Sequence, residues 1–345
     1  MLCLSHATAI NFWRAVGSGE QPFPSRIIVS GLLDCVTTEK AVLSMIPENI
    51  RTLSSKVDFL VPGKQMVHAS KRIRAHVCSA CLPASSFFRL SDQLLVSSPE
   101  LCFLQAAHMR RNSRIALAEL GMELTGGYSL NDAAKRGFTS HKPLTNVAAL
   151  RSFIDACHGV SGMGRAREAL AFMSDGSVSP RETQCNLALT LPGEHGGYDF
   201  AKPECNARVD VNGGDRRLTE QEYFSADMMW RGAEVIFEYD GDADHGTKAD
   251  SDADKNRRGI LAALGKKVIV CTGAEASDYW RFDRKAEQLA RALGFRLPLP
   301  DDDEISMRMR LQGVLFNPSH HYRSEWTAPL HPKKPCGTFD QYTSR

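Results

Sequence analysis

The stretch YFSADMMWRGAEVIFEYDG, residues 223–241, decides how the C-terminal half of the chain is interpreted. Its first part, Tyr223–Trp230, and its last part, Glu234–Tyr239, are rich in apolar, aromatic and β-branched residues, which favours two strands. The short link around Ala233 predicts that the two strands pair in antiparallel fashion. The apolar run Val235–Phe237 is typical of a central strand, so this hairpin is expected to lie inside a sheet.

Carboxylates lie on both of these expected strands. Antiparallel pairing across so short a link brings Asp227 and Glu238 to adjacent positions. Side chains alternate between faces along a strand, so Glu238 and Asp240 share a face. An acid that follows an apolar run is costly to bury without a partner. Because Mg²⁺ or Mn²⁺ is held by oxygen ligands from a few carboxylates, Asp227, Glu238 and Asp240 are the predicted metal ligands.

The flanking sequence predicts further elements around the hairpin. Ser179, followed three positions later by Glu182, has the capping-box pattern and predicts a helix start. The expected elements then follow in chain order: strand Ala207–Val211, the two strands above, a helix closed by Gly265, strand Lys267–Cys271 and a helix over 274–293. The order is helix, three strands, helix, strand, helix.

These features together resemble the DUF559 family, relatives of the very-short-patch mismatch-repair endonuclease in the PD-(D/E)XK nuclease superfamily. The resemblance covers 179–293 and rests on residues in matching order: Ala226–Trp230, Val235–Gly241, His245, Asp254, Arg257, Arg258, Leu261, Leu264, Gly265, Val268 and Ile269. It implies a restriction-endonuclease-like α/β fold and metal-dependent hydrolysis of DNA phosphodiester bonds. The implied catalytic residues are Glu182, Asp227, Glu238, Asp240 and His245.

Two positions depart from the pattern of this superfamily. Asp240 stands where most members of the superfamily have a lysine, and the DUF559 branch shares this replacement. Charge stabilisation therefore has to come from Lys248, Lys255 or Arg257. His245 lies one position further from the preceding glycine than the family's histidine, which bears on its role as a proton shuttle. These departures favour the alternative hypothesis of a non-catalytic DNA-binding regulator or antitoxin-like protein that keeps the fold.

The segment that follows the acidic loop also supplies candidate DNA contacts. Lys255, Arg257 and Arg258 are predicted to bind phosphate, with an ion pair that stabilises the helix as the alternative for the two arginines. The alternative interpretation of Asp227, Glu238 and Asp240 is a hairpin without a functional site, in which these acids are exposed to solvent. Acids in the loop 241–251 are interpreted as solvent-exposed, and an EF-hand is excluded because the glycine and the final glutamate it requires are absent.

The N-terminal half predicts an accessory or recognition domain of mixed α/β class over 1–130. Expected strands are Arg26–Val29, Val57–Val61, Arg72–Val77 and Gln93–Val96, and Ser98-Pro99 predicts a helix start. Short motifs in this part resemble the region after the winged helix of AbiEi-type abortive-infection antitoxins: Leu4–Ala9 with Trp13 and Arg14, Asp58–Pro62, Arg74–His76 and Val96–Glu100. A helical connector over 131–178, a nuclease domain over 179–298 and a C-terminal tail over 299–345 complete the prediction.

Composition sets the outer limits of these hypotheses. A chain of 345 residues predicts two domains, and a formal net charge of +2 gives no global signature of nucleic-acid binding. Ten cysteines without a secretion signal, and no long apolar run, predict a cytoplasmic protein with free thiols and no membrane partner. The lone CxxC, Cys78–Cys81, lacks the second pair of a zinc ribbon. DNA is the expected partner, together with a protein partner for the N-terminal domain; no aromatic and basic platform indicates RNA.

Overall fold

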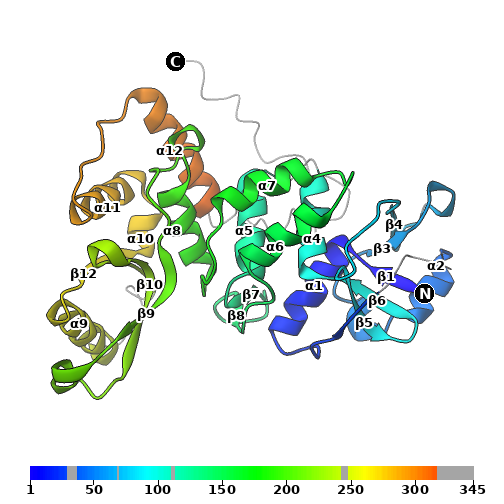
Figure 1. The fold of residues 1–345 in the computed structure, drawn as a ribbon, viewed down its shortest axis with the longest axis horizontal. Helices are drawn as coiled ribbons and strands as arrows, with labels where there is room; N and C mark the ends of the chain where they lie inside the picture. Colours follow the sequence, from blue (N-terminus) through cyan, green and yellow to red (C-terminus); the bar gives the residue numbers. More distant parts are fainter. Residues whose placement is uncertain (29–36, 68–69, 110–112, 242–247, 317–345) are drawn as a thin grey trace.

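The fold places two main sheets at opposite ends of the molecule, with helices between them (Figure 1). The computed structural model describes residues 1–28, 37–67, 70–109, 113–241 and 248–316. Within these residues, helices and mixed sheets alternate along the chain, so the predicted α/β class is confirmed. The first sheet comes from the N-terminal part and the second from the C-terminal part.

The first sheet has six strands in the order β2-β5-β6-β1-β3-β4. Their bounds are β1 Leu2–Leu4, β2 Ser25–Ile27, β3 Val57–Val61, β4 Ile73–Val77, β5 Phe87–Ser91 and β6 Leu94–Ser97. Strand β1 pairs in parallel with β6 and in antiparallel fashion with β3, while β3 and β4 run parallel. The four strands expected from the sequence are found here: β3 has the predicted bounds Val57–Val61, and the other three have shifted ends; β1 and β5 were missed, and position 29 lies outside the described residues.

Helices connect the strands of this sheet and continue past it toward the second sheet (Figure 1). Their bounds are α1 His6–Gly17, α2 Glu39–Met45, α3 Glu48–Arg51, α4 Pro99–His108, α5 Arg114–Leu124, α6 Val147–Ala156 and α7 Met163–Phe172, with a small hairpin of β7 Tyr128–Leu130 and β8 Phe138–Ser140. Helix α4 begins as predicted: the Ser98 hydroxyl accepts a hydrogen bond from the Leu101 N–H, and Pro99 occupies the first turn. Helix α1 has no counterpart among the sequence-based expectations. Helices α6 and α7 confirm the helical character predicted within 131–178.

The C-terminal part follows the predicted order of elements. They are α8 Pro180–Thr190, β9 Glu204–Asp210, β10 Tyr223–Trp230, β11 Val235–Asp240, α9 Lys248–Ala263, β12 Lys267–Thr272, α10 Gly273–Ala276 and α11 Tyr279–Ala292. The sheet order is β12-β11-β10-β9, with β9, β10 and β11 antiparallel and β11 parallel to β12. Gly265 follows α9 with φ +77°, the left-handed geometry expected of a residue that ends a helix.

The two faces of the second sheet pack against different helices. Along β11, Val235 and Phe237 belong to a core that includes residues of α8 and α11, whereas Ile236 packs with Leu261 of α9. This alternation is what a strand buried on both faces requires. The larger core continues into the N-terminal sheet, so apolar packing is unbroken across the boundaries predicted near 130 and 178.

The segment after 299, which was predicted as a C-terminal tail, contains a packed helix. Helix α12, Asp302–Phe316, buries Leu311, Leu315 and Phe316, and it contacts α8 and α11. Its buried apolar positions Leu311, Leu315 and Phe316 recur at helical spacing. Residues 317–345 lie outside the described part of the chain.

The chain turns back sharply after α8, and this turn satisfies the end of that helix. The N–H groups of Tyr198, Asp199 and Phe200 donate to the carbonyls of Ala188, Leu191 and Leu189, respectively. A helix end leaves its last carbonyls unpaired, so these bonds replace the missing intrahelical partners. Gly197 permits the approach, because a β-carbon there would overlap the Leu191 carbonyl.

We therefore predict that Gly197→Ala lowers the free energy of unfolding by about 1–3 kcal/mol, the usual range for overpacking. Gly193→Ala is the matched control, since a β-carbon at Gly193 meets nothing within 4 Å. Urea denaturation followed by circular dichroism measures both. Equal stability of the two variants would contradict the proposed close approach.

Candidate active site

Asp227 is fixed on β10 by a backbone group of the neighbouring strand. Its Oδ2 accepts a hydrogen bond from the Tyr239 N–H at 2.8 Å, and β10 and β11 pair with Met228 opposite Phe237. The carboxylate thus contacts the residue that directly follows Glu238. The predicted proximity of Asp227 to the end of β11 is confirmed.

The pKa of Asp227 is raised from 3.8 to about 7. Burial is the main cause, because a charged carboxylate is poorly solvated there, and the nearby charges of Glu182 and Glu238 act in the same direction. The hydrogen bond from Tyr239 and the charge of Arg257 oppose the shift. Three acidic groups therefore share one electrostatic environment, in which Asp227 titrates near neutral pH.

Glu182 is buried in the first turn of α8, where it serves both the helix and this acidic cluster. Its Oε1 accepts a hydrogen bond from the Ser179 hydroxyl at 2.8 Å, and its Oε2 accepts one from the Val178 N–H at 2.9 Å. The Ser179 hydroxyl in turn accepts from the Glu182 N–H, as the capping pattern predicted. Burial raises the pKa of Glu182, and these hydrogen bonds limit the rise.

Glu238 is buried near the end of β11 and is neutralised by α9. Its Oε2 lies 2.7 Å from Nη1 of Arg257, whose Nη2 donates to the Ser225 carbonyl at 2.5 Å. Arg257 thus ties α9 to both β10 and β11. The Glu238 Oε1 is buried and has no hydrogen-bond partner within the described part of the chain. One oxygen of the carboxylate is therefore left unsatisfied, which is costly.

Asp240 and Arg258 form a second ion pair beside the first. Their Oδ2 and Nη2 atoms lie 3.1 Å apart, and both side chains are partly exposed. Glu238 and Asp240 thus face the same helix, which confirms that they share a side of β11. Consecutive arginines of α9, Arg257 and Arg258, thus pair with alternate residues of β11.

The remaining predicted site residues are placed differently. Lys255 is exposed on α9. His245 lies outside the described residues, and the side chain of Lys248 is likewise not described. Among the described residues, no group of three or more His, Cys, Asp or Glu side chains is arranged to hold a metal ion. The structure groups Asp227 with Glu182 and Glu238, whereas Asp240 is paired with Arg258.

Two features of this site nevertheless suit a divalent cation. The Glu238 Oε1 is a buried carboxylate oxygen without a donor among the described residues, and the pKa of Asp227 is raised by burial first and by the nearby charges of Glu182 and Glu238 second. Both would be relieved by a hard cation bound to carboxylate oxygens. The donor set of Asp227 and Glu238 therefore fits such an ion, with Arg257 as the group that currently neutralises Glu238.

Sequence reasoning missed the backbone groups that shape this site. The Ser225 carbonyl and the Tyr239 N–H orient Arg257 and Asp227, respectively. Every residue carries such groups, so no residue type at these positions could have revealed them. The sequence also did not determine the ion-pair partner of Asp240, because two arginines and a lysine lie on the same predicted helix.

Comparison of the chain with known proteins finds no matching family model, no matching curated protein and no matching solved structure. A search of the described helices finds none with the length and apolarity needed to cross a membrane. The chemistry of the site therefore rests on its own geometry.

Asp227 gives the protein a specific pH dependence. The pKa of Asp227 is about 7 in the folded protein and 3.8 in the unfolded chain. Between pH 3.8 and about pH 7 the folded protein therefore keeps a proton on Asp227 that the unfolded chain has released. This contribution to stability is complete below about pH 4 and is lost as the pH rises through 7. Asp227→Asn removes the titration and keeps an acceptor for the Tyr239 N–H.

We predict that Asp227→Asn gains about 2–3 kcal/mol of stability relative to wild type between pH 5 and pH 8, at about 1.4 kcal/mol per pKa unit. Urea unfolding at the two pH values measures the gain. Asp215→Asn, at an exposed position, is the control and should track wild type. A constant difference between Asp227→Asn and wild type across this range would show that Asp227 does not titrate there.

Proposed function

We propose that the chain is a Mg²⁺- or Mn²⁺-dependent endonuclease that hydrolyses DNA phosphodiester bonds, with a restriction-endonuclease-like core similar to the DUF559 family. The observation that carries the proposal is the buried acidic cluster of Asp227, Glu182 and Glu238 beside Arg257. The order of elements from α8 to α11 supports it, because that order frames the cluster with two strands and two helices.

In this proposal the carboxylates of Asp227 and Glu238 hold the metal ion. The bound metal would activate a water molecule and neutralise charge on the scissile phosphate. Glu182, close enough to raise the pKa of Asp227, would orient the attacking water or bind a second ion. Asp227 titrates near neutral pH, so it is suited to hold or release a proton there. His245 remains a proposed proton shuttle.

Arg257 is the proposed replacement for the superfamily's missing lysine. Its guanidinium lies 2.7 Å from Glu238 and is fixed by the Ser225 carbonyl, so a positive charge is preorganised beside the acids. Asp240 would assist indirectly by holding Arg258, and through it α9, against β11. Of the three cations that the sequence offered for this role, Arg257 is the one described in contact with the acidic cluster.

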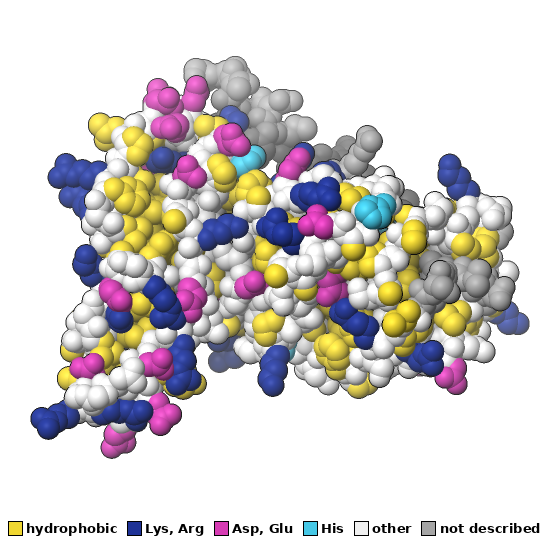
Figure 2. Space-filling view, viewed as in Figure 1, with side chains coloured by type: hydrophobic (Ala, Val, Ile, Leu, Met, Phe, Trp, Pro, Cys, Tyr) yellow, Lys and Arg dark blue, Asp and Glu magenta, His cyan; other side chains and the backbone are white. Residues whose placement is uncertain are grey.

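DNA contact would be local and not spread over the surface. Figure 2 shows lysine and arginine side chains interspersed with acidic ones on the face that it displays, consistent with the net charge of +2. Exposed Lys255 and the partly exposed Arg257 and Arg258 lie on one helix beside the acids. We propose that these residues bind phosphate groups, and that the N-terminal part recognises the substrate or a protein partner.

The alternative is a non-catalytic DNA-binding regulator, and one observation favours it. Both acids of β11 that face α9 already have arginine partners, so Glu238 and Asp240 are neutralised without a metal. A protein that had lost the chemistry would keep these ion pairs because they hold α9 on the sheet. The two hypotheses differ in whether a divalent metal and Glu238 matter for DNA cleavage.

Nicking of supercoiled plasmid distinguishes them. We predict that the purified protein nicks plasmid DNA with Mg²⁺ or Mn²⁺ and that Glu238→Gln reduces the rate by at least about a hundredfold, the scale of losing one electrostatic group at a reacting centre. Glu234→Gln is the matched control, because Glu234 is exposed and pairs with Lys266. Salt-sensitive DNA binding by wild type without metal-dependent nicking would instead support the regulator.

Metal binding can be measured without turnover. We predict that Mn²⁺ raises the melting temperature of wild type, because a ligand that binds only the folded state stabilises it. The increase should be absent in an Asp227→Asn, Glu238→Gln double variant and retained in Glu234→Gln. Equal Mn²⁺ stabilisation of the double variant would place the ion elsewhere and remove the metal site from the proposal.

A further inference from the structure

A cavity lies in the N-terminal part of the molecule, between the first sheet and helix α4. Its volume is about 230 Å³. It is lined by residues from the start of α1, the ends of β3 and β4, helix α4 and the loop before α7: His6, Leu60, Val77, Cys78, Ser79, Ala80, Leu82, Leu101, Leu104, Gln105, His108, Gly159, Val160 and Ser161. None of these residues belongs to the acidic cluster around Glu238.

The lining has a distinct chemical character. Among the described residues that line the cavity there is no aspartate, glutamate, lysine or arginine, and their polar side chains are those of His6, His108, Gln105 and two serines, with one cysteine. Imidazole, amide and hydroxyl groups can all donate hydrogen bonds, and no carboxylate competes for them. Leucine and valine side chains form the rest of the wall. This combination suits a small molecule with an apolar body and an oxyanion group.

His6 is held in an uncommon backbone conformation at the edge of this cavity. Its φ of 49° lies in the left-handed region, which few residues other than glycine adopt. The His6 N–H donates to Oε1 of Gln105 at 2.8 Å, and its Nδ1 lies 3.0 Å from the Ser5 hydroxyl. Strain of this kind persists where the surroundings enforce it, and it concentrates at functional sites.

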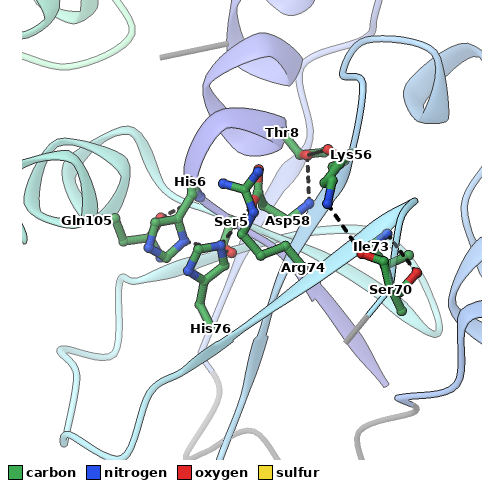
Figure 3. Close-up of polar contacts among 10 residues, drawn as sticks. All are labelled: Ser5, His6, Thr8, Lys56, Asp58, Ser70, Ile73, Arg74, His76 and Gln105. Carbon is green, nitrogen blue, oxygen red and sulfur yellow. Dashed lines mark hydrogen bonds and ion pairs between the residues drawn. The ribbon is translucent and has the colours of Figure 1, made fainter. Parts of the chain in front are cut away.

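A second imidazole and a buried acid support His6 from behind. The rings of His6 and His76 stack with centroids 3.5 Å apart and planes 15° from parallel. Nε2 of His76 lies 2.7 Å from Oδ1 of Asp58, which also lies 3.5 Å from Nε of Arg74. Figure 3 shows the two rings one above the other, with Arg74 beside the carboxylate. Asp58 thus orients His76, which in turn fixes the ring of His6.

The backbone fixes Asp58 as well. Its N–H donates to the Thr8 hydroxyl at 2.9 Å, and its carbonyl accepts from the Ser5 N–H at 2.9 Å. The strand register sets Asp58 opposite Arg74 and Leu60 opposite His76. A chain of three side chains, Asp58, His76 and His6, therefore runs from a buried carboxylate to the cavity wall, and it fixes one imidazole there before any ligand arrives.

We propose that this cavity binds a small organic anion, a phosphate or carboxylate group on a compact apolar body, and that His6 contacts the anionic group. His108 and Gln105 supply further donors, and the leucine and valine walls hold the apolar body. Asp58 and His76 are positioning residues, since they act through His6. The site is independent of the proposed nuclease chemistry.

Isothermal titration calorimetry and NMR of the histidine ring protons test this with phenyl phosphate, benzoate and uncharged benzyl alcohol as probes. We expect phenyl phosphate, benzoate or both to bind at millimolar or lower concentration and to shift the His6 ring resonance, with benzyl alcohol at least about tenfold weaker. The stronger of the two anions identifies the preferred group. Failure of both anions to bind, or equal binding of benzyl alcohol, overturns the proposal.

The decisive variant is His6→Asn, because asparagine tolerates a positive φ and keeps a polar group near the Ser5 hydroxyl. We expect it to weaken binding of the preferred anion by about tenfold or more, the scale of one lost hydrogen bond to a charged group. His195→Asn, at an exposed position, should bind like wild type. Matched melting temperatures without probe show that both variants are folded; unchanged affinity in His6→Asn overturns the proposal.

Discussion

The ion pair between Glu238 and Arg257 is the constraint on which the C-terminal architecture depends. A carboxylate that follows three buried apolar residues needs a counter-charge, because an uncompensated buried charge is strongly destabilising. Arg257 supplies that charge from α9 and also donates a hydrogen bond to the Ser225 carbonyl. The pair therefore fixes the position of the helix relative to the sheet. Without it, the Arg258–Asp240 ion pair and the packing of Ile260 and Leu261 on the sheet would have to hold α9.

The elements of the C-terminal half could be predicted because their signals are local. Tyr223–Trp230 has the bounds expected for β10, and the start of α8 at Ser179 has the expected cap. Helix α1 was missed for the opposite reason. Buried polar residues such as His6 and Thr8 interrupt its apolar pattern, and they are satisfied by partners far away in the sequence. Tertiary contacts of this kind leave no periodic trace.

The sequence was enough to name the acidic residues of the candidate site. It was not enough to predict which side chains they contact. Asp227 and Glu238 were named because acids on such apolar strands are costly to bury without a partner, whereas Glu182 was named from the resemblance to the DUF559 family. Their arrangement depends on register and on which face of a helix meets the sheet, so the pairing of Asp240 with Arg258 follows only from the packing of α9. The same limit applies to Asp58 and His76: each lies in an expected strand, but only the parallel register brings the two together.

The unbroken apolar core has a thermodynamic consequence for the whole molecule. Residues from β1 to α12 pack into one cluster, through helices such as α5, which contacts both α7 and α8. Where apolar contacts are shared in this way, neither half can expose its interior without exposing part of the other. The two halves then unfold as one cooperative unit, and free energy gained by occupancy at one end stabilises the opposite end as well. The two sheets are thus energetically coupled even though their side-chain chemistry is separate.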